Sequence, residues 1–214
     1  MGRNEMLKGI DISNWNAQYL IQRDWYDLLT ADFVIMKASE GLTYKDSCLD
    51  QYYNMVHGKT DGRPDPDKLY GFFHYARPEK YNDPKKEAQH FLSLVGHHAG
   101  HAIYALDVEG EALKMAPNYL EAWVFLWLEE VRIRTGVKPL VYCSASVTNR
   151  FQLAAENDYG LWVASWDKKP TKKMLEPWKV NAIWQNGTTN GHLDTDIFQG
   201  SAQAWKKYAK AWPH

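Results

Sequence analysis

Acidic residues stand at the ends of several short apolar runs, and one pair of them has a spacing suited to acid–base chemistry. Asp107 and Glu109 are separated by one residue at the end of the run 103–108. Successive side chains of a strand point to opposite faces, so both carboxyls would share one face, about 6–7 Å apart. Close approach of two carboxyls raises the pKa of one of them, as does partial burial. A carboxylic acid that stays protonated near neutral pH can supply the proton that glycosidic bond cleavage requires.

Other acids follow apolar runs elsewhere in the chain, among them Asp11, Glu40 and Asp194. In an α/β barrel the reactive groups gather at the C-terminal ends of the strands, so we expect these carboxyls to meet. A site for Mg²⁺ or Ca²⁺ is an alternative use of clustered carboxylates. The eight histidines have no spacing typical of zinc ligands, and the sequence has neither a nucleophile elbow nor a glycine-rich phosphate loop. No metal and no cofactor are expected.

The composition favours a carbohydrate over a charged macromolecule as the ligand. Ten Trp and thirteen Tyr among 214 residues are more than a core of this size requires, and flat rings often stack on sugars. At least half of the Trp residues should nevertheless be packed in the core. The formal net charge of −1 provides no general attraction to nucleic acid or to anionic lipid, so neither is an expected partner.

The order of apolar runs and amphipathic segments predicts one α/β barrel domain over residues 1–214. Strands are expected at 8–13, 33–38, 69–75, 103–108, 140–144, 161–165, 181–185 and 193–198. Helices are predicted after the N-cap Asp83, from Pro117 to Gly136, and over 201–212, where Ser201 begins the helix. The segment Asp61–Asp67 is interpreted as a surface loop. Helices are concentrated in the first part, which predicts a barrel that loses them toward the C-terminus.

Several single residues have ordinary structural interpretations. Cys48 and Cys143 are expected to be buried free thiols rather than a disulfide. His74, on a predicted strand, is interpreted as a hydrogen-bonded core histidine, and the tryptophans of the second helix as core residues. Four other histidines are expected at the surface: His57, His90, His97 and His98.

Eight motifs in order resemble glycoside hydrolase family 25, the Chalaropsis-type lysozymes found in bacteria and as bacteriophage endolysins. They cover residues 8–199 and read GIDIS from Gly9, VIMKASEG from Val34, GFFHYAR from Gly71, LDVE from Leu106, VY from Val141, LWVASW from Leu161, IWQ from Ile183 and LDTDIF from Leu193. The resemblance implies a flattened (β/α)5(β)3 barrel with a groove across its C-terminal face. The implied activity is that of an N-acetylmuramidase acting on peptidoglycan glycan strands, and a monomer is the default expectation.

The resemblance also implies roles for individual residues. Glu109 matches the proton donor, Asp107 its partner carboxylate, and Asp11 and Asp194 the other acids of the site floor. Positions that line the groove match Glu40, Tyr142, Trp166 and Gln185, and Trp184 is a further candidate. The partner carboxylate is thought to steer the 2-acetamido group of the substrate or to stabilise the positively charged sugar.

Two positions depart from the family pattern. Phe73 stands where a Tyr is common, which removes a hydroxyl near the groove. Asp196 replaces an Asn, and as an additional negative charge it would raise the pKa of its neighbours and move the pH optimum upward. A non-catalytic module that binds cell-wall glycans remains an alternative function, and so does a glycosidase of other specificity such as a chitinase.

The expected place of action is the bacterial cell wall. Residues 1–8 are charged and lead directly into a predicted strand, without the apolar segment of a signal peptide. No apolar run is long enough to span a membrane. A phage endolysin of this kind would stay in the host cytoplasm until a holin releases it, and a bacterial enzyme would be secreted.

Overall fold

The computed structural model describes residues 6–57 and 67–211. Residues 1–5, most of the predicted loop Asp61–Asp67 and Trp212 therefore lie outside the described residues. Within them the sheet contains nine strands: β1 (Leu7–Ile12), β2 (Phe33–Glu40), β3 (Tyr44–Lys45), β4 (Leu69–Tyr75), β5 (Ile103–Asp107), β6 (Leu140–Ser144), β7 (Gly160–Ala164), β8 (Ile183–Thr189) and β9 (Leu193–Phe198). All eight predicted strands are present with ends shifted by a few residues, and β3 was not predicted.

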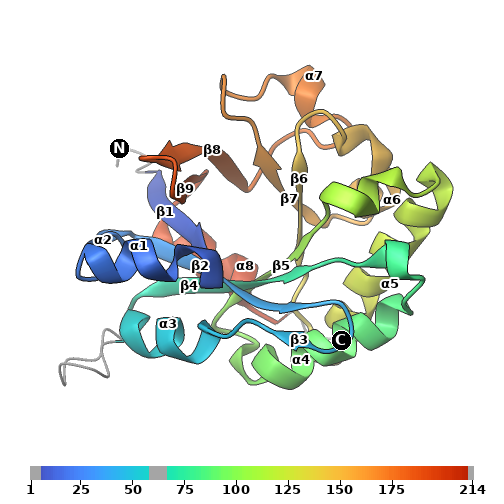
Figure 1. Cartoon of the computed structure of the whole chain (residues 1–214). Coiled ribbons are helices and arrows are strands. Elements are labelled where there is room, and N and C mark those ends of the chain that lie inside the picture. The colour runs from blue at the N-terminus through green and yellow to red at the C-terminus, as the bar shows by residue number, and fades with distance from the viewer. Residues whose placement is uncertain (1–5, 58–66, 212–214) are drawn as a thin grey trace.

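Eight of these strands close into a barrel. The first strand, β1, pairs in parallel with β2 and antiparallel with β9, which joins the two ends of the sheet. Strands β1, β2 and β4 to β8 run parallel, while β9 is antiparallel to both of its neighbours (Figure 1). The short β3 adds to the end of β2 outside the closed ring. The predicted α/β barrel is confirmed.

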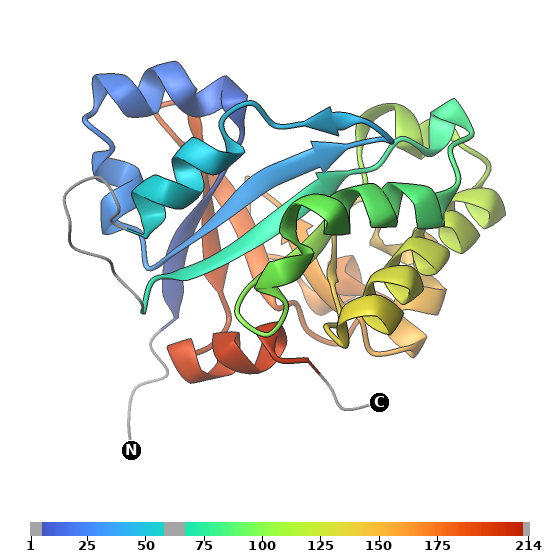
Figure 2. The same ribbon diagram turned by 90° about the horizontal axis from the view of Figure 1, so that it is seen from below.

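Helices cover the outside of the barrel, and one closes its bottom. The α-helices are α1 (Ala17–Gln22), α2 (Tyr26–Thr30), α3 (Leu49–Val56), α4 (Pro84–Val95), α5 (Pro117–Thr135), α6 (Gln152–Glu156), α7 (Lys172–Leu175) and α8 (Ala202–Ala209). Short 3₁₀ helices are η1 (Asn14–Asn16), η2 (Pro78–Lys80), η3 (Gly96–His98), η4 (Gly110–Lys114) and η5 (Thr148–Arg150). Figure 2 shows α8 across the end at which β1 begins. No helix in the described part of the chain combines the length and apolarity needed to cross a bilayer.

Capping residues confirm the predicted starts of two helices. The side chain of Asp83 accepts a hydrogen bond from the backbone of Lys85 at the start of α4, and Ser201 caps α8 through Ala204 N–H. The last helix is shorter than the predicted 201–212. It ends at Ala209, because the next residue, Lys210, has an extended backbone with φ −71° and ψ 133°.

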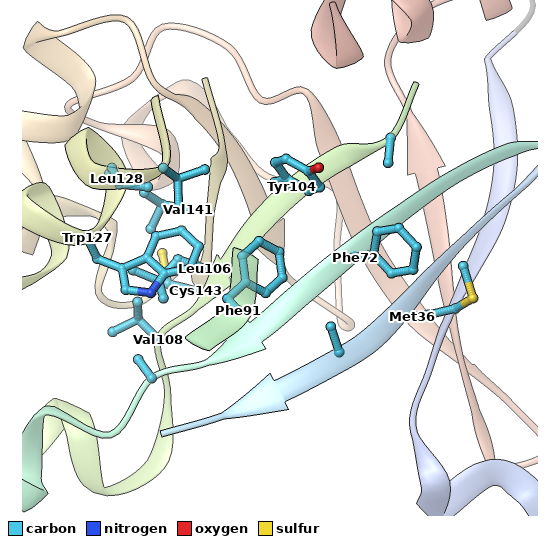
Figure 3. Close-up of a cluster of buried hydrophobic side chains, with 14 of the residues drawn as sticks. Met36, Phe72, Phe91, Tyr104, Leu106, Val108, Trp127, Leu128, Val141 and Cys143 are labelled. Atoms are coloured by element: carbon cyan, nitrogen blue, oxygen red, sulfur yellow. The ribbon is translucent and has the colours of Figure 1, made fainter. Parts of the chain in front are cut away.

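Strand alternation divides the apolar side chains into two cores. The barrel interior is filled by one set, which includes Phe33, Ile35, Ile103, Trp162, Ile183 and Trp205. The other set lies between strands and helices, where Leu106 and Val108 of the β5 segment pack with Phe91 and Trp127 (Figure 3). Gly9 is required for the inner core, since a Cβ there would lie only 2.3 Å from the Phe33 ring. Both cores leave the C-terminal ends of the strands to polar residues.

The single-residue predictions are confirmed for the core tryptophans, for Cys143 and for His97, but not for Cys48 and His98. Of the nine Trp among the described residues, five are buried, namely Trp123, Trp127, Trp162, Trp178 and Trp205. Both cysteines are free; Cys143 is buried as expected, but Cys48 is only half-buried. The surface assignment of His98 is wrong, because its ring is buried against Tyr70 and Phe72. His97 is exposed, and His57 and His90 are half-buried.

Candidate active site

A polar pocket of about 220 Å³ lies where the strands of the barrel end. It contains all four acids expected at the site floor, and they come from three segments: Asp11 from β1, Asp107 and Glu109 from the end of β5, and Asp194 from β9. The lining residues are Asp11, Ser13, Trp15, Lys37, Phe73, Tyr75, Asp107, Glu109, Tyr142, Trp162, Gln185 and Asp194. The residues that the sequence places at separate strand ends therefore meet in one site.

Asp107 and Glu109 face this pocket together because the intervening residue points the other way. Val108 is fully buried in the outer core. Asp107 is only 6% exposed, whereas Glu109 is exposed at the pocket wall. Gly110 follows with φ +56°, and a Cβ at this position would lie 2.7 Å from the Tyr75 hydroxyl. Glycine thus allows the chain to turn away immediately after Glu109 while Tyr75 stays beside it.

The surroundings of this pair favour protonated carboxyls. Burial and the charge of Glu109 raise the pKa of Asp107 well above its ordinary value. Desolvation of the Glu109 carboxyl, followed by the charge of Asp194, raises the pKa of Glu109. Lys37 opposes both shifts, and burial also raises the pKa of Asp194. The cluster therefore retains protons at a pH at which isolated carboxyls would be ionised.

Asp107 also has an unused hydrogen-bonding atom. Among the described residues, its buried Oδ1 has no hydrogen-bond partner. A buried carboxyl oxygen without a partner is costly unless a ligand satisfies it. Asp107 thus brings an unpartnered acceptor to the wall of the pocket, where a donor group of a bound substrate would satisfy it.

On the opposite wall a hydrogen-bonded chain fixes Asp11. Gln185 Nε2 donates to Asp11 Oδ2 at 2.9 Å, while Gln185 Oε1 accepts from the Tyr142 hydroxyl and from Trp166 Nε1, both at 3.0 Å. Burial, and then the charge of Asp194, raise the pKa of Asp11, although the Gln185 hydrogen bond acts against the rise. Burial and the carboxyl groups raise the pKa of Tyr142 as well, so its phenol stays a donor.

Glu40 lies in a second, adjoining pocket of about 710 Å³. The two pockets share Trp15, Lys37 and Tyr75. Glu40 accepts from Lys37 Nζ and Arg77 Nε, both at 2.7 Å. Although burial opposes it, these two cations hold the pKa of Glu40 below its ordinary value. Glu40 is thus an ionised structural partner of Lys37 rather than a proton donor.

The expected aromatic lining is only partly present. Phe73 forms part of the pocket floor. Trp166 is 53% exposed and reaches the site through its hydrogen bond to Gln185. Trp184 lies outside the linings of both pockets, contrary to its expected groove position: strand alternation turns it away from the side of Gln185, and its Nε1 donates to the Ser165 carbonyl at 2.8 Å.

Five residues of the pocket lining were not predicted as site residues from the sequence: Ser13, Trp15, Lys37, Tyr75 and Trp162. Lys37 is buried and lies 4.8 Å from the centre of the Tyr75 ring. Trp15 is 86% exposed at the junction of the two pockets, and Trp162 lies at the floor. A lysine in the run Phe33–Ala38 was the one available signal, because charged residues rarely occur in buried strands unless paired.

The arrangement is suited to proton transfer beside an uncharged, hydroxyl-rich ligand. A carboxyl pair with raised pKa values, a free buried acceptor and exposed rings are combined at one site. In the described part of the chain, no group of three or more His, Cys, Asp or Glu is arranged to hold a metal ion.

Known proteins resemble the chain along nearly its whole length. The family model of glycosyl hydrolases family 25 matches residues 10–194. An uncharacterized protein, YegX, of Escherichia coli O6:H1 is 27% identical over 212 residues, which cover 92% of this chain and 71% of that protein. The N,O-diacetylmuramidase of Arthroderma benhamiae is 25% identical over 217 residues, covering 95% and 87%. A solved family 25 lysozyme from Aspergillus fumigatus has a TM-score of 0.73 and 27% identity, covering 96% and 100%.

Proposed function

The chain belongs to glycosyl hydrolase family 25, and we propose that it is a lysozyme that cleaves peptidoglycan. The bond cleaved is the β-1,4 linkage between N-acetylmuramic acid and N-acetylglucosamine. The observation that carries this proposal is the placement of Asp107 and Glu109 on one wall of a pocket, with raised pKa values and a free acceptor on Asp107. Similarity to a protein named N,O-diacetylmuramidase supports the choice of bond.

In this mechanism Glu109 is the general acid. Its proton passes to the glycosidic oxygen as the bond from that oxygen to C1 of the muramic acid breaks. The carbonyl oxygen of the substrate's own 2-acetamido group attacks C1 and forms a cyclic oxazolinium intermediate, so no enzyme carboxylate bonds to carbon. Glu109, now ionised, removes a proton from water, and the water opens the ring with net retention of configuration at C1.

Asp107 steers the acetamido group. The attacking carbonyl becomes more nucleophilic when the amide N–H is hydrogen-bonded to a carboxylate, and Asp107 Oδ1 supplies the unpartnered acceptor. Its deeper position, at 6% exposure, suits a group that acts beneath the sugar ring rather than on the leaving oxygen. Asp11 and Asp194 complete the negative floor that stabilises positive charge at C1.

Binding of the glycan strand uses both pockets. Tyr142, Gln185, Phe73 and Trp162 surround the cleaved sugar, while Trp15 provides an exposed ring at the junction with the Glu40 pocket. We propose action at the bacterial cell wall by a monomer, because one chain supplies every residue of this site. Release through a phage holin or by secretion remains a prediction.

Digestion of purified Gram-positive cell walls tests the function. After borohydride reduction, mass spectrometry should find reduced muramic acid at the new chain ends. Reduced glucosamine ends would contradict the proposed bond specificity. Retained wall binding without release of any reducing end would favour the alternative of a glycan-binding module.

A further inference from the structure

Asp196 is a buried acid of β9 that the proposed mechanism does not use. Its side chain is 1% exposed. Trp162 Nε1 donates to Asp196 Oδ1 at 2.7 Å. Among the described residues, no backbone, amide, hydroxyl or ring N–H group donates to the buried Oδ2. Strand pairing places a second carboxyl next to it: Asp196 lies opposite Gln185 of β8 and diagonal to Asp11 of β1, and Gln185 hydrogen-bonds to Asp11. Asp11 and Asp196 each act on the pKa of the other. Two carboxyls can share a hydrogen bond only when one of them holds a proton.

The ionisable groups around Asp196 are all acidic. The acids that act on it are Asp11 from β1 and Asp194 from its own strand; Tyr142 from β6 also faces it. Glu109 acts on Asp11 from beyond β5. None of the groups that act on Asp196 in the described part of the chain is cationic. Ionisation of both Asp11 and Asp196 would therefore place two uncompensated charges side by side in a buried site.

We propose that Asp196 is a protonated carboxylic acid that donates from Oδ2 to Asp11 and is a positioning residue of the active site. Each carboxyl accepts one hydrogen bond from a neutral donor, Asp11 from Gln185 and Asp196 from Trp162. The proton belongs on Asp196 because this carboxyl is only 1% exposed, whereas Asp11 lines the open pocket and its charge is the better solvated of the two. Burial, Asp11 and Asp194 all raise the pKa of Asp196, which agrees with this assignment. Asp11 thus receives two hydrogen bonds that hold it as a carboxylate toward the pocket. In this proposal Asp196 is a neutral hydrogen-bond donor and not the additional negative charge expected from the sequence.

The pH dependence of stability tests the protonation state without reference to activity. A carboxyl whose pKa is raised by folding stabilises the protein fully below its unfolded-state pKa of about 3.9, and this contribution is lost as the pH rises toward the folded-state value. In Asp196→Asn, the side-chain amide can donate the same hydrogen bond as the protonated carboxyl, but it cannot ionise. Thermal unfolding is measured from pH 4 to pH 8. The Tm of Asp196→Asn should be similar to that of wild type at pH 4, and it should exceed the wild-type Tm by an increasing margin as the pH rises. Parallel curves would overturn the proposal.

Infrared spectra provide a direct readout of the proton. At pH 6 in D2O, the difference between wild type and Asp196→Asn should contain the carbonyl band of a protonated carboxyl. A difference that contains only carboxylate bands would overturn the assignment.

A third experiment, which rests on the proposed function, measures the cleavage of cell walls by wild type, Asp196→Asn and Asp196→Leu. Asp196→Asn should keep activity within about threefold of wild type and leave the pH optimum in place, since one neutral donor replaces another. Asp196→Leu, of similar size but without a donor, should lose about 10- to 100-fold. Equal losses in both variants, or a lower pH optimum in Asp196→Asn, would contradict a neutral donor. If wild type cleaves no wall at all, the muramidase proposal fails while the stability and infrared results still decide the protonation of Asp196.

Discussion

Asp194 and Glu109 lie about 85 residues apart in the sequence, yet they line one pocket, where desolvation and then the charge of Asp194 raise the pKa of Glu109. The antiparallel β9 makes this possible, because it pairs with β1 and brings Asp194 into register with Asp11. The pH range over which Glu109 keeps its proton therefore depends on Asp194 of the last strand as well as on the surroundings of Glu109 in its own segment.

Replacement of Asp194 by Asn should lower the pH at which activity is lost on the alkaline side. Removing the nearby negative charge favours ionised Glu109, so its pKa falls and the proton donor disappears at a lower pH. Measurement of kcat/KM against pH on a soluble glycan oligomer checks this. Asp50→Asn, at an exposed helix position outside both pockets, is the control. An alkaline limb unchanged from that of the control would contradict the coupling.

Replacement of Lys37 by Met should have the opposite effect. Lys37 lowers the pKa values of Asp107 and Glu109, so its removal should move both limbs of the pH profile upward. The same assay detects the shift, and Lys45→Met, which alters an exposed lysine, is the control. A downward shift would mean that Lys37 acts on the site by another route than its charge.

Replacement of Asp107 by Ala should lower kcat by about 10²- to 10⁴-fold with little change in KM, because the steering of the acetamido group matters mainly in the transition state. A disaccharide thiazoline imitates the cyclised acetamido group. It should raise the Tm of wild type but not that of Asp107→Ala. Equal stabilisation of both proteins would count against substrate assistance through Asp107.

The core histidine supports the strand that leads to Tyr75. In its neutral form, which burial favours by lowering the pKa, His74 donates from Nε2 to Glu87 and accepts at Nδ1 from Ser39, each at 2.8 Å. His74→Leu leaves a buried carboxyl short of a donor and should cost about 2–4 kcal/mol of unfolding free energy. Urea denaturation measures this against His101→Leu, an exposed control. Equal losses in the two variants would contradict the role of the buried hydrogen bonds.

The barrel and the four floor acids could be predicted because they depend on local patterns. Apolar runs set the strands, and alternation alone places Asp107 and Glu109 on one face. Glu40 could not be placed in this way. A β-bulge between Lys37 and Ser39 changes the alternation, so that Ser39 turns outward to His74 and Glu40 reaches the second pocket.

Long-range hydrogen bonds account for most of the remaining differences. The contact of Asp196 with Asp11 and the donation from Trp162 depend on the pairing of β9 with β1 and on the barrel interior, which no local pattern reveals. Trp184 and Gln185 are neighbours with opposite orientations, so a motif that contains both does not tell which one enters the site. His98 was misplaced for a similar reason, since its buried partners come from distant segments.

The most direct test of the account compares wild type, Glu109→Gln and Glu111→Gln on purified cell walls. Glu111 lies two residues beyond Glu109 and is exposed beside Lys114, which makes it a matched control. We predict that wild type and Glu111→Gln release reduced muramic acid ends after borohydride treatment, while Glu109→Gln, folded and able to bind walls, releases about 10²- to 10⁴-fold fewer. Muramic acid ends released by Glu109→Gln at the wild-type rate would contradict the assignment of Glu109 as the acid.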